Sequence, residues 1–177
     1  MAPISTLNKI TKNSMAPTSV FSNNVRETGP TPAPPQTSPL SARNLAFLTT
    51  LQSVYPELIF KPGRKFLFRP PRTINYLQDN ENFRLLLLHE LAHALLGHFS
   101  YQTSLQRLKL ERDAWTRTRQ LCTKHHVPFS ESLAEAELNT YRDWHHQKTL
   151  CKTCGVSCLE LNAKSLYCPF CRKIYPR

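Results

Sequence analysis

The chain has 177 residues, an ordinary hydrophobic content of 40% and a formal net charge of +11. This length allows one modest core and a small appended module, and it excludes a large multidomain protein. No run of 18 or more apolar residues occurs, and ionisable side chains interrupt the richest one, Leu85 to Leu96, so no membrane span or membrane partner is expected. The first thirty residues lack the pattern of a signal peptide, which predicts a cytoplasmic protein.

The basic excess is unevenly distributed along the chain. Residues 41–78 contain six Lys and Arg against one acidic residue, and residues 151–177 contain five against one. Residues 79–150 contain nine of each sign and are therefore neutral. Basic segments of this kind can contact nucleic acid, so the hairpin expected within the first segment and the C-terminal module are candidate nucleic-acid surfaces. A plain basic surface is the alternative.

Three segments are expected along the chain. Residues 1–40 hold seven of the fourteen prolines and almost no periodic apolar pattern, which predicts a disordered tail rich in Pro, Ser and Thr. Residues 41–148 should form one α+β domain with a small antiparallel sheet and about four helices. Residues 149–177 should form a separate cysteine module.

Within the domain, Ser41 is expected to cap a first helix that ends before Pro56. Three short strands should follow, over residues 58–60, 65–68 and 73–77, and Pro62-Gly63 is typical of a turn between the first two. Asp79 or Asn80 should begin a central helix that ends at Gly97 and is apolar nearly all round. Two further helices are expected over residues 105–124 and from about 130 to 147.

The central helix contains the sequence His89-Glu90-Leu91-Ala92-His93. Side chains four residues apart lie within about 40° of each other on one helical face, so both imidazoles can reach one Zn²⁺ ion. Glu90 lies about 100° round from His89, where it can contact a water on the metal without ligating it. Glu90 is therefore expected to act as the general base on a zinc-bound water. The alternative is a pair of packed, hydrogen-bonded histidines.

A third ligand is needed, and the candidates are His98, Glu111 and Asp113. His98 fits poorly, because the extended motif has glycine seven and histidine ten residues after the first ligand, and here the offsets are eight and nine. Glu111 is the only charge on a stripe of helix that is expected to be buried, whereas Asp113 lies about 200° away among basic side chains. Glu111 is therefore the predicted ligand.

Two C-x-x-C pairs, Cys151/Cys154 and Cys168/Cys171, are separated by thirteen residues. This spacing is typical of a ribbon in which four thiolates close on one structural Zn²⁺. A segment of about 25 residues has little core, so metal binding must supply its folding free energy. Cys122 and Cys158 are left over as ordinary thiols, although Cys158 could substitute in the ribbon.

Residues Phe83 to His98, followed by Glu111-Arg112-Asp113-Ala114, resemble the ImmA/IrrE-type zinc peptidases. Those proteins have a His-Glu-x-x-His helix and a later helix whose Glu-x-x-Ala segment supplies the third ligand. The resemblance covers about residues 41–125 and implies a minimal gluzincin, that is zincin-like, fold and a regulatory protein substrate. It departs at Trp115, where such relatives usually have Asn or Asp.

A peptidase domain followed by a four-cysteine ribbon is also similar in layout to the SprT-like proteases, which act on proteins attached to DNA. The His-Gly pair that supplies the third ligand in that family is absent. Three functions therefore remain: a zinc metallopeptidase that hydrolyses an intracellular protein or peptide substrate, a DNA-associated protease, and a non-enzymatic zinc-ribbon binding protein. Tyr141 is a candidate for stabilising the oxyanion, with helix packing as the alternative.

Overall fold

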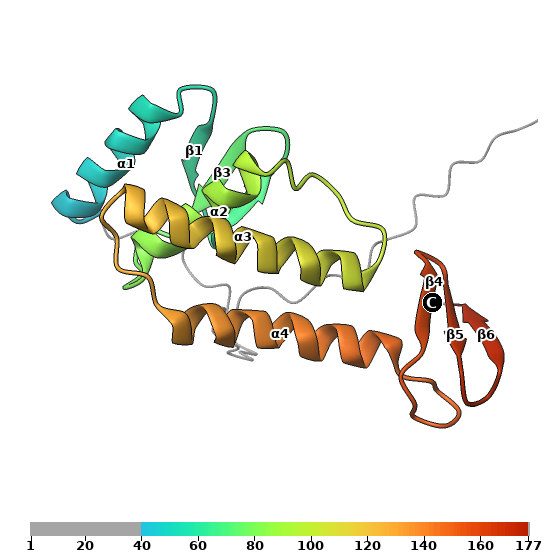
Figure 1. Ribbon diagram of the computed structural model, residues 1–177. Coiled ribbons are helices and arrows are strands. Elements are labelled where there is room, and N and C mark those ends of the chain that lie inside the picture. The colour runs from blue at the N-terminus through green and yellow to red at the C-terminus, as the bar shows by residue number, and fades with distance from the viewer. Residues whose placement is uncertain (1–39, 177) are drawn as a thin grey trace, which may run out of the picture.

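Four helices and two three-stranded sheets make up the described part of the chain, residues 40–176 of the computed structural model (Figure 1). The expected α+β class is confirmed. The predicted tail, apart from Leu40, lies outside the described residues. None of the described helices is long and apolar enough to cross a membrane.

The first helix, α1 (Ala42–Val54), leads into the first sheet, which has the order β1-β3-β2. Its strands are β1 (Ile59–Pro62), β2 (Leu67–Arg69) and β3 (Thr73–Tyr76). The expected antiparallel pairing holds for β2 and β3, but it is wrong for β1 and β3, which are parallel. The expected hairpin between β1 and β2 is also wrong, because β3 lies between them.

The reason for this order lies at Pro62-Gly63, which does not reverse the chain. The N–H of Gly63 donates to the carbonyl of Tyr76 at 2.8 Å, so the segment continues along β3. A Cβ at Gly63 would lie 3.2 Å from Cβ of Asn75, so glycine allows this close approach. The chain then passes to the other side of β3, and β2 becomes the edge strand beside the helix that follows.

That helix, α2 (Phe83–Leu95), is the buried centre of the domain. It packs against β2 and β3 on one side and against α3 (Ser104–Lys124) on another. The helix begins at Phe83, a little later than the expected cap at Asp79 or Asn80, although Asn80 Oδ1 accepts from the N–H of Asn82. Gly97 ends it at φ +67°, a conformation that favours glycine, as expected.

Helices α3 and α4 (Glu131–Thr149) lie side by side, and the four-cysteine module, residues 150–176, follows α4 (Figure 1). The module's sheet, β4 (Leu159–Asn162), β5 (Ser165–Cys168) and β6 (Lys173–Pro176), is antiparallel throughout. Helices α3 and α4 agree with their expected ranges within a few residues. The hydroxyl of Ser130 caps α4 by accepting from the N–H of Leu133.

The module is joined to the domain by Glu160 of β4. Its Oε1 accepts from the N–H and hydroxyl of Ser104 at 3.1 and 2.6 Å, and its Oε2 accepts from the N–H of Leu105 at 2.9 Å. Helix α3 has no acidic residue in its own first turn, so the module supplies the carboxylate that helix N-termini favour. His145 of α4 lies 2.7 Å from the Ser104 hydroxyl and completes the contact.

We expect Glu160→Ala to lower the free energy of unfolding by about 1–3 kcal/mol, because the fully buried Ser104 loses the acceptor of its N–H. Urea unfolding of the metal-loaded protein measures this change. The control is Glu135→Ala, which removes an exposed ion pair with Arg142 and should cost at most about 1 kcal/mol. Equal losses in the two variants would show that Glu160 contributes no more than a surface charge.

Candidate metal centres

Helices α2 and α3 bring His89, His93 and Glu111 together in the core. The Nε2 atoms of the two histidines are 3.2 Å apart. Oε2 of Glu111 lies 3.2 Å from Nε2 of His93 and 3.4 Å from Nε2 of His89. The three residues chosen from the sequence therefore present three ligand atoms to one point, and they could hold a metal ion.

Nε2 of His89, Nε2 of His93 and Oε2 of Glu111 form a triangle, called here the ligand triangle. The size of this triangle fits a tetrahedral ion. Bonds of about 2.0 Å to nitrogen or oxygen give a tetrahedron with edges of about 3.3 Å. The three observed separations, 3.2, 3.2 and 3.4 Å, match one face of that tetrahedron. The fourth corner is not supplied by these three residues, so an ion held here would have one position left for a further ligand.

Glu111 is held as a carboxylate although its residue is only 3% exposed. Burial by itself raises the pKa of this carboxyl, but its hydrogen bonds to His89 and His93 outweigh burial and bring the pKa well below its usual range. A buried negative charge facing two imidazole nitrogens suits a cation between them.

The two histidine rings are supported in different ways. Nδ1 of His93 lies 3.0 Å from Nδ1 of His98, so His98 can accept the Nδ1 hydrogen that His93 carries when it ligates through Nε2. His98 is therefore a neighbour of the site and not its third ligand. The ring of His89 stacks on Trp115 at 4.1 Å between centroids, and among the described residues its Nδ1 has no hydrogen-bond partner.

Glu90, the expected general base, points toward the edge strand. Its Oε2 accepts from the N–H of Phe68 in β2 at 2.6 Å. Phe68 is the middle residue of β2, and this N–H would otherwise face outward from the sheet edge. The edge strand thus fixes the carboxylate beside the histidine pair, and Glu90 is absent from the ligand triangle, as expected.

Arg107, which the sequence analysis did not consider, also reaches the site. It lies one turn before Glu111 on α3, and its Nη2 is 3.3 Å from Oε1 of that residue. Tyr141, the candidate for the oxyanion, is buried and lies 3.5 Å from the same Nη2. The signal that could have identified Arg107 is its spacing, since residues four apart on a helix are neighbours.

The other acidic candidate, Asp113, is not part of the site. Its side chain is 48% exposed and pairs with Arg112 at 2.8 Å. The exposure of Asp113 agrees with its predicted place on the far side of this helix from the buried Glu111.

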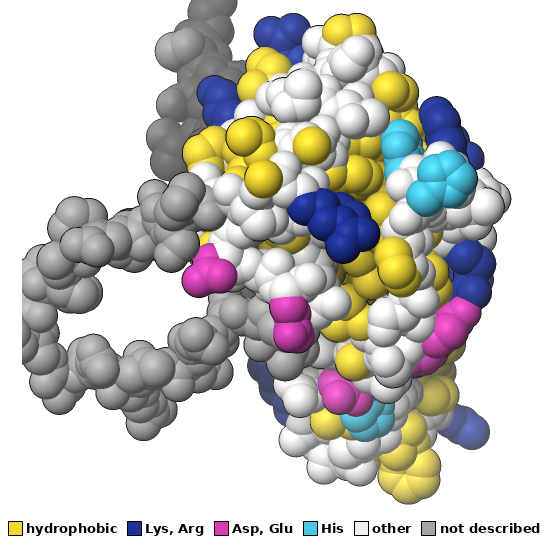
Figure 2. All heavy atoms as spheres, turned by 90° about the vertical axis from the view of Figure 1, so that its left-hand side faces the viewer, with side chains coloured by type: hydrophobic (Ala, Val, Ile, Leu, Met, Phe, Trp, Pro, Cys, Tyr) yellow, Lys and Arg dark blue, Asp and Glu magenta, His cyan; other side chains and the backbone are white. Residues whose placement is uncertain are grey.

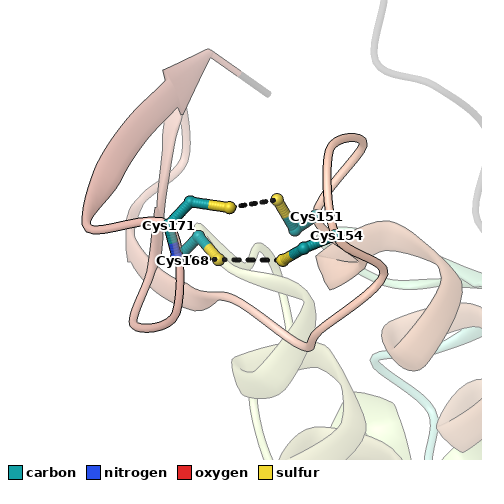
Figure 3. Close-up of side chains that lie close together, drawn as sticks. All are labelled: Cys151, Cys154, Cys168 and Cys171. Atoms are coloured by element: carbon teal, nitrogen blue, oxygen red, sulfur yellow. Dashed lines mark hydrogen bonds between the residues drawn. The ribbon is translucent and has the colours of Figure 1, made fainter.

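The second centre is the cysteine cluster (Figure 3). The side chains of Cys151, Cys154, Cys168 and Cys171 point toward one another, two from the segment after α4 and two from the end of β5 and the turn that follows it. The sulfur atoms of Cys151 and Cys171 are 3.9 Å apart, and those of Cys154 and Cys168 are 3.6 Å apart. Bonds of about 2.3 Å to sulfur give tetrahedral edges of about 3.8 Å, so this set also fits one ion.

Backbone donors support the thiolate form of two of these cysteines. The N–H of Cys171 donates to Cys168 Sγ at 3.3 Å and lowers the pKa of that thiol. Burial raises the pKa of the Cys151 thiol, but N–H donors, including that of Thr153 at 3.4 Å, outweigh burial and lower it. Thiolates are the form that binds a metal.

The two remaining cysteines do not join this cluster. Burial raises the pKa of both Cys122 and Cys158 to about 11. Cys122 lies in the core of the domain, whereas Cys158 packs beside the four cysteines without entering the ligand set. Among the described residues, Cys122 and Cys158 therefore belong to neither candidate metal site, and both are free thiols.

Comparison with known proteins gives no match. No family model fits the chain, and no curated protein or solved structure is significantly similar to it.

We expect Glu111→Ala to lower the metal content from two ions to about one per chain, because two groups of ligands are present and this variant breaks one of them. Asp113→Ala is the matched control and should keep both ions. Elemental analysis of protein loaded with zinc and then desalted measures the content. Cys168→Ser should empty the other centre alone, and loss of all metal in that variant would contradict two independent sites.

Proposed function

We propose that this chain is a zinc-dependent metallopeptidase with a structural zinc ribbon formed by its four-cysteine module. The observation that carries the proposal is the ligand triangle of His89, His93 and Glu111, with Glu90 fixed beside it. Two imidazoles and one carboxylate with an open fourth position are a donor set typical of catalytic zinc. Four thiolates with no open position are typical of structural zinc.

The residues of this chain would divide the chemistry among them. Zinc bound in the triangle would polarise a water molecule and the carbonyl oxygen of the substrate. Glu90 would accept a proton from that water and later deliver it to the leaving amine. The N–H of Phe68 holds Oε2 of Glu90 in place, so the carboxylate needs no reorganisation before the proton transfer.

The position of the edge strand favours a peptide as the substrate. β2 is the edge of its sheet and contacts α2, the helix that carries the histidines. An extended peptide could lie beside this edge next to Glu90, although the outward N–H of Phe68 already donates to that carboxylate. The resemblance to the ImmA/IrrE-type peptidases supports the same class of substrate and adds that it is a regulatory protein. The chain departs from this resemblance at Trp115. This residue stacks on His89, and those proteins usually have Asn or Asp at the same position.

We expect Glu90→Gln to keep both metal ions and to lower peptide hydrolysis by about 10²-fold or more, because an amide cannot accept the proton. The assay is cleavage of fluorescent casein and of a degenerate peptide library by zinc-loaded protein. Glu81→Gln, which changes an exposed carboxylate before the same helix, is the control and should retain full activity. Undiminished cleavage by the Glu90 variant would refute the role of Glu90. A zinc-loaded wild type that cleaves nothing in the library would favour the non-enzymatic alternative.

A second, compatible proposal is that the module contacts nucleic acid, as in a DNA-associated protease. Its described residues expose Lys152, Lys164, Arg172 and Lys173, and their one carboxylate, Glu160, faces the start of α3. Figure 2 shows the face at the α1 end, where Lys and Arg side chains are scattered among hydrophobic and acidic ones. The module is therefore a better candidate than the basic segment of residues 41–78.

If the module contacts phosphates, the affinity for a single-stranded oligonucleotide should fall linearly with salt on a log–log plot. Lys164→Ala and Arg172→Ala should each reduce that slope by about 0.7–1. Fluorescence anisotropy at several salt concentrations measures it, with Lys109→Ala on α3 as the control. Weak binding whose slope is the same in all variants would leave the module with a structural role alone.

A further inference from the structure

The two oxygens of Glu111 face different partners. Oε2 lies 3.2 and 3.4 Å from the ligating nitrogens of His93 and His89. Oε1 lies 3.3 Å from Nη2 of Arg107. One carboxylate therefore bridges the candidate metal site and a guanidinium that stays charged at any physiological pH.

Arg107 is itself held in a defined place. Its guanidinium lies over the rings of Tyr101, at 4.9 Å, and Tyr141, at 5.3 Å. Nη2 also lies 3.5 Å from the hydroxyl of Tyr141. The side chain is only 24% exposed, so the two rings and Glu111 leave it little freedom. These contacts come from the segment before α3 and from α4, and together they fix the guanidinium relative to the ligand.

We propose that Arg107 is a positioning residue that restricts Glu111 to ligation through one oxygen. The inference rests on the metal site of the proposed function. A carboxylate can bind a metal through either one or both oxygens, and two-oxygen binding would use the corner that a water needs. Arg107 occupies Oε1 with a charge-assisted contact and so keeps that oxygen away from the ion. The separations of Oε2 from the two Nε2 atoms, 3.2 and 3.4 Å, match tetrahedral edges to a single oxygen and so agree with this mode.

The simpler alternative is that Arg107 and Glu111 form a buried helical ion pair that only stabilises the fold. The two roles differ in what they predict for the metal. If Arg107 only restricts Glu111, removing its positive charge from beside the cation site should strengthen metal binding or leave it unchanged. Removal of a residue that merely holds the fold together should weaken metal binding. The coordination number separates the roles further, because a purely structural residue does not change it.

The experiment uses the full chain with zinc in the cysteine centre and cobalt in the histidine centre, loaded in that order. Absence of a thiolate-to-cobalt band verifies the placement of the cobalt. The visible bands of Co²⁺ are strong when the ion is four-coordinate and weaker when it is five-coordinate. Arg107→Met keeps the length of the side chain without its charge and should lower the band intensity about twofold as Glu111 binds through both oxygens.

Two controls accompany this variant. Arg107→Lys keeps the positive charge and should retain the spectrum of the wild type. Arg112→Met changes an exposed arginine on the same helix and should also leave it unchanged. Should Arg107→Met fail to fold, as judged by circular dichroism, Arg107→Leu provides a second neutral side chain that has no hydrogen-bond donor for Oε1 of Glu111.

A wild-type cobalt spectrum in the folded neutral variant would overturn the proposal. A loss of cobalt affinity in that variant would overturn it as well, because Arg107 would then serve to hold the site together. Neither result depends on peptide cleavage, so the proposal can fail while the metallopeptidase function stands. A wild type that binds no cobalt at the histidines would instead refute the metal site and the proposed function.

Discussion

The structure depends on placing three ionisable side chains between two helices, α2 and α3, whose other buried residues are mostly apolar. His89 and Glu111 are 8% and 3% exposed, and around them α2 buries Leu85 to Leu88, Leu91 and Ala92. A carboxylate in such surroundings is costly unless opposite charge or hydrogen-bond donors meet it. The separations of 3.2–3.4 Å among the three ligand atoms meet this requirement and leave room for one cation. The edge strand, α3 and Arg107 then serve to hold that arrangement in place.

The four-cysteine module is connected to this arrangement through α3. Glu160 accepts from the N–H groups of Ser104 and Leu105 at the start of the helix. Arg107 and Glu111 follow one and two turns later. If the module folds on a metal, as proposed, the metal supplies the free energy of folding for these residues and the cap on α3 depends on it. The first turn of α3 is therefore expected to be more stable when the cysteine centre is filled. The contact links two centres that share no ligand.

The sequence predicted the elements whose signal is local. The spacing of His89 and His93 and the stripe of α3 that contains Glu111 follow the helical period, so it could be predicted that these three residues lie together. The strand order could not, because each strand has only three or four residues and Pro62-Gly63 continues along β3 where a turn was expected. Glu160 was missed for a different reason. It lies 56 residues from Ser104 in the sequence, and no periodic pattern reports a contact over that distance.

The two histidines of the site differ in a way that bears on how firmly each is held. His93 has a polar partner in His98, which restricts the rotation of its ring and can accept its Nδ1 hydrogen. His89 is oriented by stacking on Trp115, and stacking limits the tilt of a ring without specifying which nitrogen carries the hydrogen. A polar side chain at position 115 could accept a hydrogen bond from Nδ1 of His89, which has no partner among the described residues. Trp115 gives up that hydrogen bond and fills the core instead, at 4% exposure. Of the two histidines, His89 is thus the one whose orientation relies more on the packing of α2 against α3.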